Sequence, residues 1–149
     1  MYLPLHFKVK GKRLLFVGGG RVNERRILSA LKAGASVVLV APEATEALKE
    51  LALRGAIEWR RRCFHPSDLD GVHMVFVAIP RGYHEVVEHA RRRGVMVECA
   101  SEHELGDFIF PAVVRRGDVL ISVSTSGTSP ALSKRLREAI ENLLDGMGL

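Results

Sequence analysis

The chain has 149 residues, of which 47% are hydrophobic, and a formal net charge of +5 at pH 7. This length allows one globular domain with a core and a short appendage, and excludes a cofactor domain followed by a separate full-sized catalytic domain. No apolar run approaches the roughly 20 residues that span a bilayer, and the N-terminus lacks a signal-peptide pattern. We therefore expect a cytoplasmic protein without a membrane partner.

The excess positive charge lies in short arginine runs at residues 60–62, 91–93 and 115–116. A polyanionic ligand would profit from such a field. However, the runs are scattered, no aromatic residues that stack on bases lie among them, and no recognition motif accompanies them. We expect a solvated surface rich in arginine and no nucleic-acid partner.

The two cysteines, Cys63 and Cys99, are isolated in the sequence and lack the spacing of metal ligands or of a redox pair. Cys99 lies inside an apolar run. Because unpaired cysteine is commonly buried, we expect two buried free thiols and no metal site.

Apolar runs alternate with helical patterns from residue 13 to about residue 100, which predicts parallel strands joined by crossover helices. The fold class is α/β, a Rossmann-like parallel sheet with helices on both faces. The predicted strands are 13–17, 37–40, 57–59, 74–77 and 95–97, and the predicted helices are 21–33, 45–54 and 83–93. The predicted inner face of the first helix carries Val22, Ile27, Leu28 and Leu31.

A tight glycine turn, Gly18-Gly19-Gly20, joins the first strand to the first helix. Bare glycines let the backbone approach a pyrophosphate, and the free N–H groups at the start of the helix face the anion. The spacing fits a dinucleotide motif whose third position, usually Gly or Ala, is Asn23 here. The alternative is that the turn holds glycine for steric reasons alone.

The pattern changes beyond residue 106 to a small α+β segment. Two β-like runs, 108–114 and 119–123, predict a hairpin, and Ser129 and Pro130 are typical of the start of a helix over 130–144. One stripe of this helix carries Leu132, Leu136, Ile140 and Leu143. A hairpin and one helix are too small to bury that stripe, so we expect it to pack on a second copy of the chain.

Four segments resemble, in order and spacing, the precorrin-2 dehydrogenase family, which forms the dehydrogenase part of siroheme synthase. They are Tyr-Leu-Pro-Leu at 2–5, the turn at 17–22, Asp-Phe-Ile-Phe-Pro-Ala at 107–112 and the Ser/Thr-rich loop at 124–130. The resemblance implies a homodimer that oxidises precorrin-2 to sirohydrochlorin with NAD, in siroheme biosynthesis. It also implies an NAD-binding Rossmann domain over 1–106 and a dimerisation segment over 107–149.

The resemblance also implies a set of cofactor-binding residues. Glu43 lies 23 residues after Gly20, where an acid accepts from ribose hydroxyls and repels a 2′-phosphate, which favours NAD over NADP. Arg21 would favour the opposite preference, and Glu43 as an ordinary first-turn helix residue is the alternative. The implied cofactor residues are Gly18, Gly19, Gly20, Arg21, Val22, Pro42, Glu43 and Ala78.

The tetrapyrrole substrate carries many carboxylates, so hydroxyl groups at a helix start and arginines suit it. The alternatives are simple helix capping by Ser129 and ordinary surface arginines on a hairpin. The implied substrate-binding residues are Ser124, Thr125, Ser126, Gly127, Thr128, Arg115 and Arg116.

The chain departs from the family at the expected acid/base. Ser101 stands where the family has an aspartate, and a serine hydroxyl is only weakly basic. Glu102 or His103 would substitute for it, and a solvated loop is the alternative for both. The polar lip after the fourth strand, usually Thr-Asp-Asp, is replaced by residues 78–82, and the helical domain that usually follows is expected to be absent.

These departures leave three hypotheses for the function. The first is the NAD-dependent dehydrogenase, because the cofactor carries the redox chemistry; iron insertion, which needs a base, is doubtful. The second is a non-catalytic relative that binds a dinucleotide or tetrapyrrole as a sensor or partner subunit. The third is a chelatase without a redox role that uses His103 or Glu104.

Overall fold

The computed structural model describes residues 1–149. Contacts divide the chain into two compact units, one over residues 4–108 and the other over residues 109–149 together with 1–3. None of the helices combines the length and the hydropathy that crossing a bilayer requires. Both cysteines are free; Cys99 is buried as expected, whereas Cys63 is exposed, which corrects the expectation of two buried thiols.

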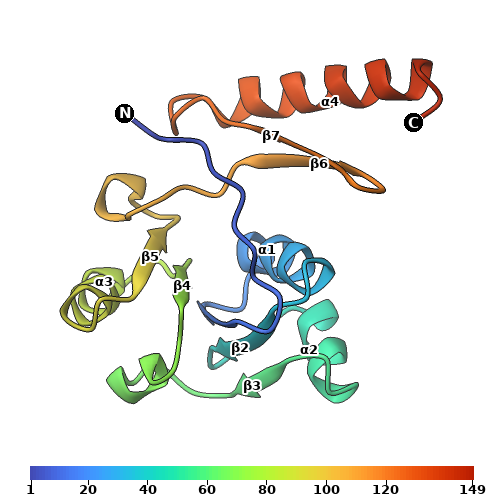
Figure 1. Cartoon of the computed structure of the whole chain (residues 1–149). Helices are drawn as coiled ribbons and strands as arrows, with labels where there is room; N and C mark the ends of the chain where they lie inside the picture. Colours follow the sequence, from blue (N-terminus) through green and yellow to red (C-terminus); the bar gives the residue numbers. More distant parts are fainter. The chain divides into compact units, whose positions relative to one another are not determined.

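The first unit is built on a five-stranded parallel sheet in the order β3-β2-β1-β4-β5 (Figure 1). From β1 the chain winds outward through β2 and β3, and then returns to the other side of β1 for β4 and β5. The carboxyl ends of β1 and β4 are therefore the point where the winding direction reverses, which is where such sheets bind ligands. The strands are β1 Arg13–Val17, β2 Ser36–Val40, β3 Glu58–Arg60, β4 Met74–Val77 and β5 Met96–Cys99.

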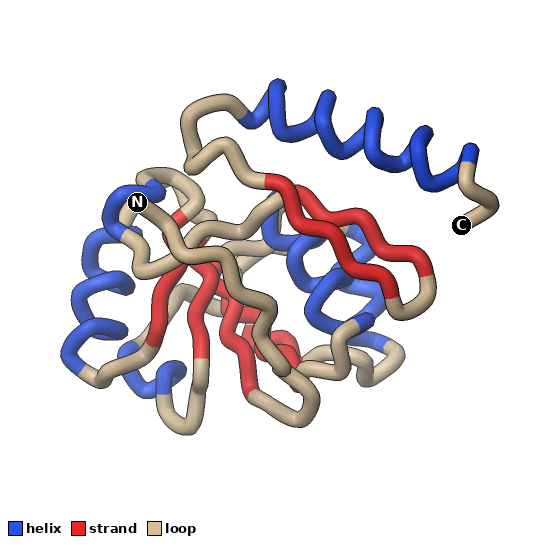
Figure 2. The backbone as a smooth tube through the Cα atoms, turned by 45° about the horizontal axis from the view of Figure 1, so that its top comes forward, coloured by secondary structure: helices blue, strands red, loops and turns tan.

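Helices lie on both sides of the sheet, as expected (Figure 2). The α-helices are α1 Arg21–Lys32, α2 Glu46–Leu53 and α3 Tyr83–Arg92. Two short 3-10 helices, η1 Pro66–Leu69 and η2 His103–Leu105, were not predicted, since each is shorter than the periodic pattern that reveals a helix.

Each face of the sheet has its own apolar layer, because successive side chains of a strand alternate between faces. On one face, Val75 and Val97 lie in a buried cluster with Val86 and Ala90 of α3. On the other, Phe16 of β1 stacks on the neighbouring Phe76 of β4, with ring centroids 4.6 Å apart. Phe108 meets the Phe76 ring edge-on at 5.5 Å.

The inner face of α1 differs from the predicted one. Val22 and Leu28 are each 40% exposed, whereas Asn23, Ile27 and Ala30 are buried. These three residues follow an i, i+4, i+7 stripe, which is also a valid helical face. Hydropathy alone could not select it because its first member is polar.

The second unit contains an antiparallel hairpin, β6 Ala112–Arg116 and β7 Val119–Val123, followed by α4 Pro130–Gly146. The predicted strand 108–114 was wrong in its first half, because β6 begins only at Ala112. Pro111 has no N–H group to donate to a partner strand, and the apolar Phe108 that suggested a strand instead packs against Phe76.

Candidate dinucleotide site

The glycine turn lies at the carboxyl end of β1, and its three glycines have different surroundings. A Cβ on Gly18, whose φ is +112°, would lie 2.2 Å from the carbonyl oxygen of Ala78. A Cβ on Gly19 would lie 2.2 Å from the carbonyl oxygen of Glu43. Two other loops therefore cross the turn at backbone distance, so these two glycines are required by packing.

Gly20 has no such constraint. A Cβ on it would meet nothing within 4 Å, and its backbone is extended, with φ −89° and ψ −173°. It is the N-cap of α1, and no side chain there accepts a hydrogen bond from the first turn. The start of α1 thus offers free N–H groups beside open space, which is the arrangement that binds phosphate oxygens.

Asn23 holds the turn in place from the first turn of α1. Its side chain is fully buried, and Nδ2 donates to the carbonyl oxygens of Val17, at 3.1 Å, and Gly18, at 2.9 Å. This explains how a larger residue occupies the third motif position. Sequence analysis noted only that Asn23 is larger than the usual Gly or Ala. Its amide group, which has two N–H donors, was the feature that could have indicated a role in holding the turn.

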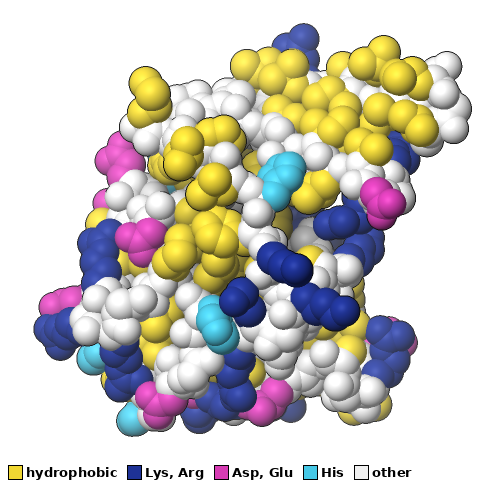
Figure 3. Space-filling model, viewed as in Figure 1, with side chains coloured by type: hydrophobic (Ala, Val, Ile, Leu, Met, Phe, Trp, Pro, Cys, Tyr) yellow, Lys and Arg dark blue, Asp and Glu magenta, His cyan; other side chains and the backbone are white.

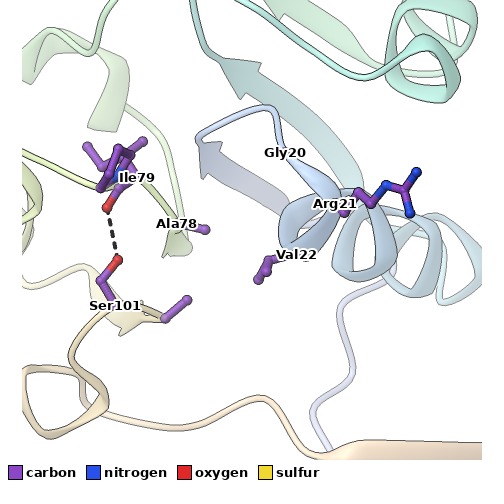
Figure 4. Close-up of a pocket in the computed structure, with 8 residues that line it drawn as sticks. Gly20, Arg21, Val22, Ala78, Ile79 and Ser101 are labelled. Atoms are coloured by element: carbon purple, nitrogen blue, oxygen red, sulfur yellow. Dashed lines mark hydrogen bonds between the residues drawn. The ribbon is translucent and has the colours of Figure 1, made fainter.

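A hollow of about 280 Å³ opens beside Gly20 at the reversal point of the sheet. The Val22 side chain points toward Ala78 and Ser101, whereas that of Arg21 points away from them (Figure 4). The Ser101 hydroxyl donates to the carbonyl oxygen of Ile79 at 2.9 Å. The lining residues are Gly20, Arg21, Val22, Ala78, Ile79, Pro80, Ala100 and Ser101.

Arg21 is the one titratable residue among those lining residues. The wall is otherwise apolar or hydroxylic, so it suits an uncharged ring and carries no group that takes up a proton near neutral pH. Ser101 thus lines the hollow, and its hydroxyl is only weakly basic.

A second hollow, of about 650 Å³, lies between the first turns of α1 and α2 and shares Arg21 and Val22 with the first. Thr45 is the N-cap of α2, and its backbone N–H donates to the Gly19 carbonyl at 3.0 Å, which ties this wall to the glycine turn. The other lining residues are Glu24, Arg25, Thr45, Glu46 and Ala47.

Pro42 and Glu43, the expected ribose contacts, are exposed and line neither hollow. The Glu43 carboxylate lies 3.7 Å from the guanidinium of Arg61. That guanidinium in turn lies over the Trp59 ring, 5.1 Å from its centroid. Sequence reasoning missed this arginine, which partly neutralises the acid expected to select NAD.

The two expected substitutes for the family aspartate lie outside both hollows. Glu102 contacts the start of α3 instead: its Oε2 lies 3.4 Å from Nε2 of His84. Burial, together with the charge of Glu102 and a hydrogen bond to it, raises the pKa of Tyr83. His103 begins η2 and is half-buried.

A buried ion pair joins α1 to β5. Arg26 donates to the carboxylate of Glu98, whose side chain is 3% exposed. Burial raises the pKa of Glu98 to about 7, against the opposing effect of Arg26. The pair fixes the helix that begins at the hollow to the strand that ends there, and sequence reasoning did not find it because its partners lie 72 residues apart.

The expected substrate-binding loop belongs to the second unit, and its hydroxyl groups are largely engaged. Thr125 Oγ1 donates to the carbonyl of Ser129, and Thr128 Oγ1 donates to that of Thr125. Ser129 Oγ accepts from the N–H of Leu132, so it caps α4 as the alternative interpretation held. Ser126, with φ +57°, and Gly127 form the left-handed part of the loop.

The two candidate arginines of the hairpin differ. Arg116 reaches α4, where its guanidinium lies 3.4 Å from the Asp145 carboxylate. Arg115 is exposed and forms no ion pair, so it is the freer cation for a carboxylate ligand. The structure contains no group of three or more His, Cys, Asp or Glu side chains placed to hold a metal ion.

A parallel sheet in this strand order, with a glycine turn and an open helix start at its reversal point, defines a dinucleotide-binding protein of the Rossmann type. The family described as "Putative NAD(P)-binding" matches residues 5–112, and the family described as "Sirohaem biosynthesis protein central" matches residues 116–143.

Comparison with similar proteins shows to which family of dinucleotide-binding proteins the chain belongs. The precorrin-2 dehydrogenase of Bacillus subtilis is 32% identical over 145 residues, which cover 97% of this chain and 90% of that protein. The solved structure of SirC, a precorrin-2 dehydrogenase, superposes with a TM-score of 0.80 at 31% identity, covering 95% of this chain and 70% of that one. The chain belongs to the family of precorrin-2 dehydrogenases and siroheme synthases.

The chain spans only part of some relatives. The siroheme synthase of Photorhabdus laumondii is 36% identical over 145 residues, which are 96% of this chain and 31% of that protein. The family matches and the superposition on SirC confirm the resemblance and the fold class that the sequence predicted.

Proposed function

We propose that this protein is an NAD-dependent dehydrogenase that oxidises precorrin-2 to sirohydrochlorin in siroheme biosynthesis. The observation that carries the proposal is the open start of α1 at Gly20, beside a hollow lined by the ends of β4 and β5. The Bacillus subtilis relative, which the chain matches over 90% of its length, bears the name of that activity.

The residues present fit a dinucleotide. Gly18 and Gly19 leave no room for side chains, while Gly20 leaves space where phosphate oxygens would accept from the first N–H groups of α1. The two hollows, which meet at Arg21 and Val22, would take the two halves of the cofactor. Bound NAD would supply the electron acceptor of the reaction.

We further propose NAD over NADP. Glu43 follows β2 and would accept from ribose hydroxyls, while its carboxylate would repel a 2′-phosphate. Arg61 lies 3.7 Å from that carboxylate and weakens this repulsion without removing it, because the pair is exposed to solvent.

The domain organisation belongs to the same proposal: an NAD-binding domain over 1–106 and a dimerisation segment over 107–149. Hydrophobic side chains gather over α4 and the hairpin (Figure 3). Leu132, Leu136 and Leu143 of α4 are 42%, 41% and 64% exposed. A second copy of the chain would cover these leucines and form a homodimer. The proposed substrate of that homodimer is the tetrapyrrole.

A second candidate function rests on one observation. Ser101 stands where the resemblance implies an aspartate, and no carboxylate or imidazole lines the hollow beside it. A relative that binds a dinucleotide or tetrapyrrole without turning it over would show this pattern. Iron insertion is not proposed, since it requires a base to remove the pyrrole protons.

Comparing the wild-type chain with Ser101→Asp separates the two functions. Both are incubated anaerobically with precorrin-2 and NAD, and NADH is followed. We expect the wild type to turn over, with the variant within about tenfold of it, a difference of about 1.4 kcal/mol in barrier. Turnover by Ser101→Asp alone would instead identify the natural chain as a binding protein.

A further inference from the structure

Proton transfer is the part of the reaction that the hollow itself does not explain. The proposed oxidation removes two hydrogens from the substrate. One leaves carbon with both bonding electrons and reduces NAD to NADH. The other leaves as a proton, and the electrons of its former bond form the new double bond. A group must accept that proton, and neither Ser101 nor the apolar lining does so.

A cluster of titratable side chains follows Ser101 directly in the chain. Glu102 extends to the start of α3, where its Oε2 lies 3.4 Å from Nε2 of His84. The rings of Tyr83 and His84 stack with centroids 4.6 Å apart, and a hydrogen bond joins Tyr83 to Glu102. The imidazole is thus held from two sides.

The cluster is joined to the wall of the hollow at two places. Ser101, which precedes Glu102, donates its hydroxyl to Ile79, so the loop after β5 is tied to the loop after β4. Pro80 of that second loop lines the hollow, and α3 begins three residues later at Tyr83. His84 remains 68% exposed, so its imidazole is open to solvent and to a ligand.

We propose that His84 accepts the proton released from the substrate and that Glu102 is the positioning residue that orients its imidazole. The inference rests on the proposed function. When Nε2, which lies 3.4 Å from Oε2 of Glu102, carries the ring hydrogen, Nδ1 carries the lone pair that takes the proton. An imidazole suits transfer near neutral pH better than a carboxylate, whose ordinary pKa lies well below it.

The test uses His84→Gln and Glu102→Gln in the full chain, with precorrin-2 and NAD. The same helix offers a matched control, because His89 Nε2 lies 3.8 Å from Oε1 of Glu85 one turn further along. His89→Gln and Glu85→Gln therefore change the same chemical pair at another place. The readouts are kcat, KM, the pH profile of kcat, NAD affinity by calorimetry, and the imidazole NMR signals of the cofactor-free protein.

We expect His84→Gln to lower kcat about 100-fold with little change in KM, and to remove the rise of kcat with pH that an imidazole base produces. We expect Glu102→Gln to lower kcat about tenfold and to move the NMR signal of His84 further than Glu85→Gln moves it. NAD affinity and the activity of His89→Gln should match the wild type.

A kcat within about threefold of the wild type in His84→Gln, or an effect on KM alone, would overturn the inference and leave the proposed function standing. An unchanged His84 signal in Glu102→Gln would overturn the positioning role. Wild-type protein that binds NAD without turnover would overturn both the proposed function and the role of His84.

Discussion

The three residues of the glycine turn differ in the space around them, and this difference bears on folding and on the proposed binding in different ways. Gly18 and Gly19 are packed against the carbonyl oxygens of Ala78 and Glu43, whereas Gly20 faces open space. The steric interpretation therefore applies to Gly18 and Gly19, and the proposed contact with phosphate oxygens falls on Gly20. The sequence could not distinguish them, because the contacts of Gly18 and Gly19 come from loops distant in the chain.

Gly20→Val should weaken NAD binding at least tenfold, about 1.4 kcal/mol, and leave the fold intact. Its extended backbone accepts valine, and the added methyl groups occupy the space proposed for the phosphates. Calorimetric titration with NAD and the unfolding temperature check the two parts. Gly146→Ala, on an unobstructed glycine of α4, is the control and should bind as the wild type does.

Wild-type affinity in Gly20→Val would place the pyrophosphate elsewhere. Gly19→Ala provides the contrast: its methyl group would lie 2.2 Å from the Glu43 carbonyl oxygen, so we expect lower stability rather than a selective loss of binding.

Asp68, in η1, shows how one buried charge stabilises the first unit. Its side chain is fully buried and accepts hydrogen bonds from Arg60, from Arg62 and from the backbone N–H of His65. Although burial opposes it, hydrogen bonds from Arg62, His65 and Arg60 lower the pKa of Asp68 from 3.8 to about 2.

Because the folded-state pKa of Asp68 is lowered, its stabilising effect is complete above about pH 4 and is lost as the pH falls toward about 2. We expect Asp68→Asn to lower the free energy of unfolding at pH 7 by about 2 to 3 kcal/mol, the equivalent of the pKa shift, and to lose less stability than the wild type over that acidic window. Urea unfolding at several pH values measures this. Equal acid sensitivity in both proteins would show that Asp68 is not the group responsible.

At the scale of elements, strands β1 and β7 match their predicted bounds, because each is an apolar run ended by a turn. The predicted start of β6 was wrong, because a run of apolar residues does not show that Phe108 packs elsewhere or that strand pairing begins only after Pro111. On the inner face of α1, Ile27 was predicted correctly, but exposed Val22 and Leu28 were predicted there as well. The buried Asn23 was not predicted because it is polar.

The exposed leucines of helix α4 allow the proposed dimer to be tested. Leu136→Glu should raise the dissociation constant of the proposed dimer at least about 100-fold, about 2.8 kcal/mol, because it would bury a charge in an apolar interface. Lys134→Glu, on the opposite side of the helix, is the control. Sedimentation equilibrium distinguishes them; a wild-type monomer, or a Leu136→Glu dimer of unchanged strength, would contradict this use of the leucine stripe.

For the whole molecule, the order of motifs indicated the family, which the comparisons confirm. The candidate site was only partly predictable. Gly20 and Ser101 line the same hollow because the carboxyl ends of parallel strands meet at one edge of a sheet. The direction of Glu102 toward His84, 18 residues earlier in the chain, depends on loop geometry that no local pattern encodes.

The most direct measurement is anaerobic incubation of the purified wild-type chain with precorrin-2 and NAD, in which NADH and sirohydrochlorin are both quantified against a control without enzyme. We predict that the two products form in equal amounts over many turnovers, and faster with NAD than with NADP. NAD binding without either product would contradict the proposed dehydrogenase and favour the non-catalytic relative.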